Sequence, residues 1–255
     1  MPKNSSESKK PLVSFIIRTK NEQRTIGKLL KVLTEQTFKN FEIIVVDDSS
    51  TDKTLEIVNS FSKKLPIRIL KIKPGEFNYS YVLNLGASKA KGKYLCSLVG
   101  HSLPFSKTWL ADGLSNFKDP KIAGISAYYN EIPISYIFPR IGKFFFRPSD
   151  KKRLNFNPGM TNTCSIIRKD LWKKYPFDEK LKEGCEDYDW ACEMLARGYN
   201  VVKDPRFNIF HSHLYLGQRI NWLARKKRWK LLVSKINKRK RPRKSYTRLK
   251  LRSKV

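Results

Sequence analysis

The sequence has no long apolar run and no acidic residue after Asp204, which leaves its C-terminal part strongly basic. No apolar stretch approaches the roughly 20 residues that a transmembrane helix needs, so a membrane-spanning protein is not expected. The polar start MPKNSSESKK precedes only a short apolar stretch at 12–17, too short for the apolar core of a secretory signal. These absences predict a cytoplasmic protein whose chain starts at Met1.

Cysteines are also scarce. There are 4 of them, none in a CxxC pair. Four are too few for a disulfide scaffold in a chain of this length, and no two stand at the spacing of a zinc site. We therefore expect reduced cysteines that pack in the interior, which suits the cytosol.

The charge is unevenly distributed. The chain carries 53 Lys and Arg against 22 Asp and Glu, a net +31. The segment 219–255 holds 17 of the basic residues. We predict a polar N-terminal tail at 1–10, a folded domain at 11–218, and a basic amphipathic helix with a disordered tail at 219–255. A basic helix with Trp and Leu is typical of an interfacial membrane anchor. Nucleic-acid binding and a merely solvated end are the alternatives.

Strand and helix patterns alternate along the first hundred residues. Short β-branched and aromatic runs stand at 12–17, 41–46, 67–72 and 93–99. Helical patterns lie between them at 26–33, 51–61 and 79–91. This alternation predicts an α/β fold with a mostly parallel central sheet and ligands beyond the carboxyl ends of its strands.

The periodicity weakens after the fourth strand. Segment 128–158 is rich in Tyr, Phe, Pro and Lys, and we expect a long loop or short irregular elements there. Its aromatics are predicted either to contact an acceptor or to pack in the core: Tyr128, Tyr129, Tyr136, Phe138 and 144–146. A strand is expected at Thr163–Arg168 and a helix at Glu186–Arg197, ended by Gly198.

Acidic side chains stand at two places where ligands are expected. Asp47 and Asp48 follow the second buried strand, where paired carboxylates are costly unless something uses them. The alternative is that one of them caps the next helix. Glu186, Asp187 and Asp189, with Glu183, form a dense acidic start of a helix. Like-charge repulsion there raises a carboxyl pKa toward that of a general base. The alternative is a solvated first turn favoured by the helix dipole.

The 3 histidines form a third candidate site. His211 and His213 lie two residues apart, on one side of an extended segment. His101 follows the fourth strand. Imidazoles bind metals or donate to phosphates.

Several motifs in this order resemble a glycosyltransferase of family 2 with the GT-A fold. They are VSFIIRTKNE, FEIIVVDDSSTD, LNLGASKAKGKYLCSL, PGMTNTCSIIRKDLW, FDEKLKEGCEDYDWACEMLARGYNV and FHSH. The resemblance covers about residues 12–213. The FNYSYVLNLGA and FHSH segments look most like a bacterial branch with rhamnosyltransferase-like enzymes.

The resemblance implies roles for individual residues. A nucleotide-diphosphate sugar donor would be bound by residues after the first two strands and in the third helix: Thr19, Asn21, Glu22, Asp47, Asp48, Asn84 and Gly86. Asp187 resembles the base that takes a proton from the acceptor hydroxyl. Glu186 and Asp189 would support it or hold the acceptor.

One motif departs from the family pattern. The family places Asp-x-Asp after strand four for a divalent metal, whereas here Val99 and His101 stand at those positions. Imidazole suits Mn²⁺ better than Mg²⁺, so we expect either a manganese-type site at His101, with His211 or His213, or catalysis without metal.

Together these observations predict an inverting glycosyltransferase of cell-surface glycan synthesis. The expected partners are a nucleotide-diphosphate sugar, a glycan or lipid-linked acceptor, and the anionic inner face of the cytoplasmic membrane. No specific nucleic acid is expected. A nucleic-acid-binding protein and a sugar-nucleotide binder without activity are the alternative functions.

Overall fold

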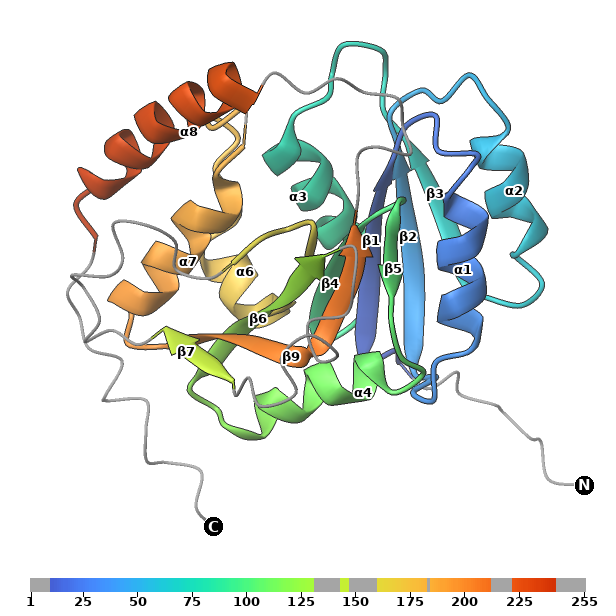
Figure 1. Cartoon of the computed structure of the whole chain (residues 1–255), viewed down its shortest axis with the longest axis horizontal. Coiled ribbons are helices and arrows are strands. Elements are labelled where there is room, and N and C mark those ends of the chain that lie inside the picture. The colour runs from blue at the N-terminus through green and yellow to red at the C-terminus, as the bar shows by residue number, and fades with distance from the viewer. Residues whose placement is uncertain (1–9, 131–142, 147–159, 183, 212–221, 242–255) are drawn as a thin grey trace, which may run out of the picture.

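The computed structural model describes residues 10–130, 143–146, 160–182, 184–211 and 222–241. In chain order the elements are β1 (Val13–Thr19), α1 (Ile26–Thr34), β2 (Phe41–Asp47), α2 (Thr54–Ser60), β3 (Ile67–Lys71), α3 (Tyr79–Lys89), β4 (Tyr94–Val99), β5 (Ser102–Pro104), α4 (Trp109–Leu114), a 3₁₀ turn (Ser115–Lys118), β6 (Ile122–Asn130), β7 (Phe144–Phe146), β8 (Cys164–Arg168), α6 (Lys169–Lys174), α7 (Glu186–Ala196), β9 (Asn200–His211) and α8 (Trp222–Asn237). Figure 1 shows them arranged around one central sheet.

The sheet has a parallel half and a mixed half. Its order is β3-β2-β1-β4-β8-β6-β9-β5, and β7 pairs with β9. Strands β3, β2, β1 and β4 are mutually parallel, as the alternation of strand and helix predicts. Strand β8 then runs antiparallel to β4, and β6 is antiparallel to β8 but parallel to β9. The chain order thus reverses direction across the sheet between β1 and β4, which is where such folds bind ligands.

Helices cover both faces of the sheet. On one face, alternate residues of β1 (Val13, Phe15, Ile17) pack against α1, α2 and α4. On the other face, Ile16 packs against α3, α6 and α7. This two-sided burial explains why the first strands read as continuous apolar runs. All four cysteines are free and buried, as expected: Cys96, Cys164, Cys185 and Cys192.

The local signals place most helix ends correctly. Asn78 caps α3, because its side-chain oxygen accepts from the backbone N–H of Ser80 at 2.9 Å. Gly198 follows the end of α7 with a φ of 86°, the left-handed conformation that favours glycine there. Helix α2 begins at Thr54, three residues later than predicted, because the preceding residues form the turn after β2.

The segment 128–158, expected to be a long loop or short irregular elements, contains regular strand at both described parts. Strand β6 extends to Asn130, and Phe144–Phe146 form β7 against β9. On β6, the Tyr128 ring lies 4.9 Å from the Nζ atom of Lys203. Tyr136 and Phe138 lie outside the described residues. Long-range pairing with β9 creates these strands, and no local period reveals it.

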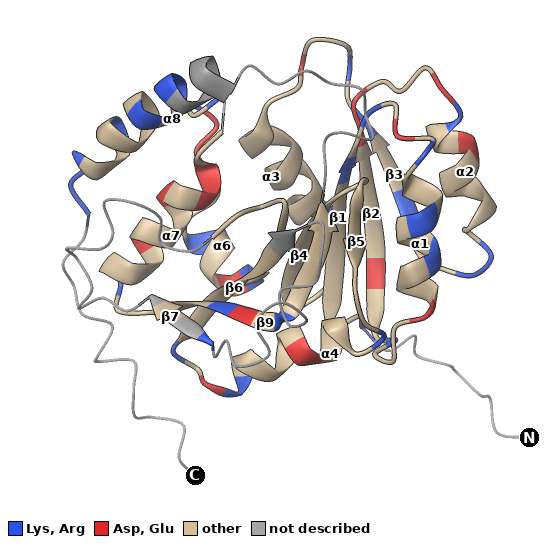
Figure 2. Ribbon diagram, viewed as in Figure 1, with Lys and Arg blue, Asp and Glu red and all other residues tan. Residues whose placement is uncertain are grey.

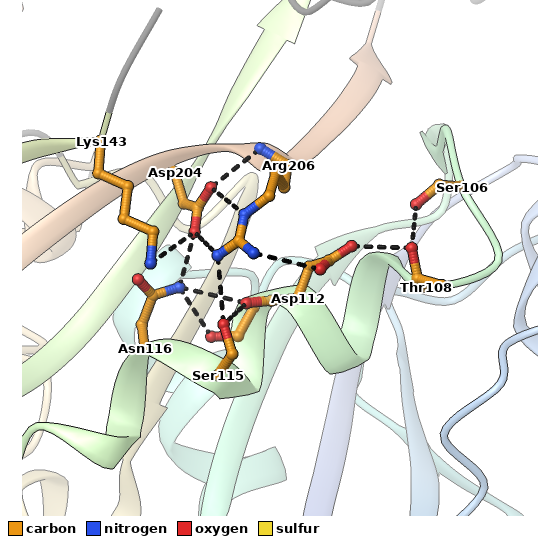
Figure 3. A network of polar contacts seen from close by, with 9 residues as sticks. Ser106, Thr108, Asp112, Ser115, Asn116, Lys143, Asp204 and Arg206 are labelled. Carbon is orange, nitrogen blue, oxygen red and sulfur yellow. Dashed lines mark hydrogen bonds and ion pairs between the residues drawn. The ribbon is translucent and has the colours of Figure 1, made fainter.

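Strand β9 contains a bulge that is held by a polar network (Figure 3). Its register with β6 shifts between Ala127 and Tyr128. In the bulge, the buried carboxylate of Asp204 accepts from Asn116 at 2.9 Å and pairs with Arg206 at 2.8 Å. Burial acts to raise the pKa of Asp204, but the hydrogen bonds from Arg206 and Asn116 outweigh it and lower the pKa. These satisfied contacts stabilise the strand and leave no group free for chemistry.

The predicted basic helix forms and packs on α7 (Figure 1). Its Val233 and Ile236 are buried against Leu181, Tyr188 and Cys192. The Tyr188 hydroxyl also donates to Asn237 Oδ1 at 2.8 Å. This apolar side therefore faces protein and not lipid. Within the described ranges, no helix combines the length and apolar character needed to cross a bilayer.

Candidate functional site

The carboxyl ends of β1, β2 and β4 meet at one edge of the sheet. Thr19, the last residue of β1, is in register with Asp47 at the end of β2. On the other side, Arg18 is in register with Val99 at the end of β4. The sheet therefore brings the polar residues after β1, the aspartates after β2 and the His101 segment after β4 to one edge, as the strand pattern predicts.

Buried polar atoms without a hydrogen-bond partner gather at this edge. In the described part of the chain, six buried side-chain nitrogen or oxygen atoms lack a partner. Four of them stand here: Arg18 Nε, Thr19 Oγ1, Glu22 Oε2 and Asp48 Oδ1. Unsatisfied buried polar groups are costly in a native protein, and a cluster of them indicates that a bound polar ligand completes their hydrogen bonds.

The two aspartates after β2 differ in their surroundings. Both Asp47 carboxylate oxygens accept hydrogen bonds from Ser50, one from its hydroxyl at 2.5 Å and one from its backbone N–H at 3.0 Å. Asp48 pairs with Lys20 through one oxygen at 2.8 Å and keeps the other without a partner. Asp48 thus keeps an acceptor for a ligand, whereas Asp47 holds the turn after β2. Neither aspartate caps the next helix, because the N-cap of α2 is Lys53.

Asn21 also joins these two turns. Its Oδ1 accepts from the backbone N–H of Thr51 at 2.8 Å, and its own N–H donates to Ser50 Oγ at 2.9 Å. Asn21 and Ser49 have φ values of 52° and 51°. Non-glycine residues with such left-handed φ values carry strain that often marks functional loops. Asn21 therefore holds the shape of the site, and its side-chain oxygen is already used in a contact within the protein.

His101 lies between Glu22 and His211. Its Nδ1 is 2.8 Å from Glu22 Oε1, and its Nε2 is 3.1 Å from His211 Nε2. The structure thus brings together two of the three predicted histidines from segments 110 residues apart. His213 lies outside the described residues. Gly100 makes room for this arrangement, because a Cβ there would lie 1.8 Å from Glu22 Oε2.

The histidine pair has part of the arrangement of a metal site, although the contact between the two rings is itself a hydrogen bond. A histidine that binds a metal through one ring nitrogen usually donates its other ring N–H to a carboxylate. Glu22 has that position next to Nδ1 of His101. Two imidazoles with facing Nε2 atoms supply two protein ligands and leave other positions for a diphosphate. Within the described residues, however, no group of three or more His, Cys, Asp or Glu side chains gathers around one point.

The acidic start of α7 lies across the same edge. Asp187 Oδ2 accepts from the backbone N–H of Asn162 at 3.1 Å, and its Oδ1 accepts from that of Tyr188 at 2.7 Å. The Asn162 side-chain amide donates to Glu186 Oε1 at 3.3 Å. Glu186 is only 4% exposed, while Asp187 is half-buried. Asp187 is therefore the carboxylate of this pair that a ligand reaches.

Both carboxyl groups hold protons more tightly than usual. Burial raises the pKa of Asp187, and the hydrogen bonds from Asn162 and Tyr188 only partly offset it. Burial and the negative charge of Asp187 raise the pKa of Glu186. In both cases the Arg18 charge acts in the opposite direction. A carboxylate with a raised pKa is a stronger base, as the acidic cluster in the sequence predicts.

Sequence reasoning missed Arg18 and Asn162. Arg18 is 8% exposed, its guanidinium lies 5.3 Å from the centre of the Tyr79 ring, and its Nη2 donates to the main-chain oxygen of Asn162 at 3.0 Å. Asn162 in turn bonds Asp187 and Glu186 at the start of α7. A buried Arg at the end of a β-strand was a signal that the sequence offered, since Arg is rarely buried without a role.

Two residues expected to bind the donor serve packing. The Asn84 side chain bonds the segment before α7: its Nδ2 donates to the main-chain oxygen of Phe177 at 2.8 Å, and its Oδ1 accepts from Trp172 Nε1 at 3.0 Å. At Gly86 a Cβ would lie 2.5 Å from a side-chain carbon of Ile16, so glycine lets α3 approach β1. Both residues place α3 against the sheet.

Asp189 is likewise occupied. Its carboxylate pairs with Arg241 at 2.6 Å and Arg239 at 3.0 Å, and accepts from the Tyr175 hydroxyl at 2.9 Å. The side chain is 1% exposed. These three partners favour a supporting role over contact with an acceptor.

Comparisons with known proteins agree with this geometry. Residues 14–175 match the description "Glycosyl transferase family 2". A glucuronosyltransferase of Methanococcus voltae that acts on a dolichyl N-acetylglucosaminyl phosphate is 30% identical over 220 residues, covering 79% of this chain. Glycosyltransferase AglE of Haloferax volcanii is 34% identical over 201 residues, covering 75% of this chain. The chain spans 66% and 64% of the lengths of these two relatives.

Solved structures share the fold. A mannosyltransferase of Pyrobaculum calidifontis, in complex with GDP-Man and Mn²⁺, has a TM-score of 0.69 and 19% identity over 92% of this chain and 67% of its own. Staphylococcus aureus TarS with UDP-GlcNAc has a TM-score of 0.65 and 19% identity over 91% of this chain and 68% of its own. At this identity the likeness shows the GT-A fold. With the matched family and the relatives, it establishes that this chain belongs to glycosyl transferase family 2.

Proposed function

We propose that this chain transfers a sugar from a nucleotide-diphosphate sugar to a hydroxyl acceptor, with inversion at the anomeric carbon, in the synthesis of a cell-surface glycan. The observation that carries the proposal is the group of four partnerless polar atoms at the ends of β1 and β2, across the sheet edge from the half-buried Asp187. A donor beside a base that an acceptor can reach is the arrangement that a single displacement needs.

The donor would lie over the ends of β1 and β2. Asp48 Oδ1 accepts, and Thr19 Oγ1 both donates and accepts, so together they suit the base or ribose of a nucleotide. The Arg18 Nε–H would donate to the diphosphate or the sugar. Mannose and N-acetylglucosamine donors accompany the two structures of the same fold. The donor class of this chain is inferred from that likeness and from these atoms.

Asp187 would act as the general base. It would take the proton of the acceptor hydroxyl, whose oxygen then forms the bond to the anomeric carbon. The bond from that carbon to the diphosphate oxygen breaks, and its electron pair leaves with the nucleoside diphosphate. The Asn162 backbone N–H orients the Asp187 carboxylate for this task. Glu186, buried beneath it, supports the base through the Asn162 amide.

His101 and His211 would hold a divalent ion at the donor diphosphate. The ion would neutralise the charge that develops on the leaving group. Imidazole nitrogens favour Mn²⁺ over Mg²⁺, and the P. calidifontis mannosyltransferase structure contains Mn²⁺. Glu22 keeps the His101 ring oriented through its 2.8 Å contact with Nδ1.

The exposed side of α8 would attach the enzyme to an anionic membrane surface, where a lipid-linked acceptor is found. Figure 2 shows basic residues along this helix and acidic ones on α7 beneath it. The outward residues include Lys227, Lys230 and Lys235, with Leu231 58% and Trp229 37% exposed. Each basic residue near such a surface contributes about 1 kcal/mol. Sedimentation with anionic vesicles tests this idea with the variant Lys227→Gln/Lys230→Gln/Lys235→Gln. Binding that the triple variant retains, or a preference for RNA over vesicles, would contradict it.

A donor screen by thermal shift tests the proposed function. GDP-, UDP- and TDP-sugars are each added with and without Mn²⁺, and a ligand of the folded state raises the melting temperature by mass action. We expect one nucleotide class to raise it. Asp48→Asn and Thr19→Val should abolish the rise.

Glu56→Gln, an exposed carboxylate on the neighbouring α2, is the matched control and should keep the rise. Transfer is then measured with the stabilising donor and lipid extracts as acceptor. If no nucleotide sugar stabilises the wild type, donor binding at this edge is refuted. Stabilisation without transfer would instead identify a binder without activity.

A further inference from the structure

We infer that Arg239 and Arg241, which follow the end of α8, are positioning residues that hold the first turn of α7 and so place Asp187. The inference rests on the proposed role of Asp187 as base. Two residues of the basic C-terminal segment would then stabilise the enzyme's own structure and would not bind an external anion.

Arg241 makes the tightest of these contacts. Its Nη2 lies 2.6 Å from Asp189 Oδ1, and its Nη1 lies 3.0 Å from Glu193 Oε2. The same Nη1 donates to the main-chain oxygen of Asp189 at 3.2 Å. One guanidinium thus bridges two carboxylates one turn apart on α7, in the planar geometry that Arg alone provides.

Arg239 connects α7 to a second segment. Its Nη1 lies 3.0 Å from Asp189 Oδ2, and its Nη2 lies 2.7 Å from Asp178 Oδ2. The main-chain oxygen of Asp178 accepts in turn from Ser80 Oγ of α3 at 2.8 Å. Arg239 therefore ties α7 to the loop that α3 also holds.

The carboxylates depend on these partners because they are buried. The side chains of Asp189 and Glu193 are 1% and 4% exposed, and that of Arg241 is only 13% exposed. Removing one partner of a buried ion pair leaves a charge without compensation, which is strongly destabilising. Arg197 pairs with Glu193 at 2.7 Å, but Asp189 has its two ion pairs only with Arg239 and Arg241 in the described structure.

The contacts converge on the turn that carries the base. Asp189 lies two residues after Asp187, and Tyr188 between them bonds Asn237 at the end of α8. Cys185, before the turn, has a left-handed φ of 68° and caps α7 with no side-chain hydrogen bond. Asn162 and Tyr175 hold the turn from other segments, and the α8 end adds the ion pairs of Asp189. Loss of those pairs would displace Asp187 from Asn162.

Full-length point variants test the inference. Arg241→Gln and Arg239→Gln remove the pairs, and Arg241→Lys keeps the charge. Lys238→Gln and Lys240→Gln are matched controls, because these exposed neighbours form no ion pair with a described residue. Two readouts are taken well below the melting temperature: hydrogen exchange of the backbone amides of 186–192, and kcat with the donor KM.

We expect Arg241→Gln to speed amide exchange in 186–192 while β1–β4 stay protected. Its kcat should fall about 10- to 100-fold, as expected for a base displaced by about 1 Å, with the donor KM nearly unchanged. Arg239→Gln should act in the same direction, and Arg241→Lys should recover part of kcat. The lysine controls should match the wild type.

Exchange and kcat of Arg241→Gln that equal those of Lys240→Gln would overturn the inference. So would exchange that rises equally in all elements, because that result shows a general loss of stability. If Arg241→Gln does not fold, Arg239→Gln and Arg241→Lys decide the question. If the wild type transfers no sugar, the proposed function fails, whereas exchange in 186–192 still shows whether the arginines hold α7.

Discussion

Arg18 Nη2 donates a 3.0 Å hydrogen bond to the main-chain oxygen of Asn162, and this bond joins the two halves of the candidate site. Arg18 lies next to the last residue of β1, at the edge where the donor would bind. Asn162 orients Asp187 and Glu186. The Arg18 charge also lowers the pKa of Glu22, Glu186 and Asp187 relative to what burial alone would give. One buried cation thus acts on acids of both halves.

Replacing Arg18 should therefore change the pH dependence of transfer. Asp187 must be ionised to accept a proton, so kcat falls as the pH drops through its raised pKa. Arg18→Gln removes a charge that favours the ionised form, so the pKa rises and the loss of kcat begins at a higher pH. Transfer rates from pH 4 to 9 provide the measurement. Arg68→Gln, an exposed arginine on β3, should leave the profile unchanged.

Asp187→Asn should abolish transfer without preventing donor binding. Removal of a general base costs about 10²- to 10⁴-fold in rate. The donor contacts at β1 and β2 do not involve Asp187, so the donor-induced rise in melting temperature should persist. Asp170→Asn, at a carboxylate that is 51% exposed, is the control and should keep full kcat. Turnover that survives in Asp187→Asn would assign the base elsewhere.

Gly100→Ala should disrupt the histidine site. Its Cβ would lie 1.8 Å from Glu22 Oε2, so Glu22 has to move away from His101. We expect a loss of about 1–3 kcal/mol in the free energy of unfolding, typical of overpacking. In denaturant titrations, Glu22→Ala should cancel most of the extra loss when both changes are combined. Strictly additive losses would show that the two residues do not meet.

His211→Ala should weaken metal binding more than catalysis at saturating metal. One of two imidazole ligands is lost, so the Mn²⁺ concentration at half-maximal rate should rise by about 10- to 100-fold, as for other losses around metal ligands. Asp187→Asn, which removes neither proposed metal ligand, should bind Mn²⁺ as the wild type does in calorimetry. Wild-type transfer that keeps its full rate with all metal chelated would show that transfer needs no metal.

The sequence determined the parallel half of the sheet and the places where chemistry gathers. Buried β-branched strands and the Ile26–Leu33 helical face follow from local periodicity, which each short segment carries within itself. Acidic and histidine motifs at the strand ends were recognisable for the same reason. Parallel strands bring their carboxyl ends to one edge, so the meeting of Thr19 with Asp47 followed from the pattern alone.

Only the tertiary structure decided which polar atoms are left for a ligand. Asp47 and Asp48 are adjacent and alike in sequence. Ser50 bonds both oxygens of Asp47, whereas Lys20 bonds only one oxygen of Asp48 and leaves the other without a partner. Asp189, expected to support the base or hold the acceptor, pairs with two arginines about fifty residues away, which favours the supporting role. Ser50 lies only three residues from Asp47. Lys20 and the two arginines come from distant segments, and no local pattern predicts partners that folding brings together from so far apart.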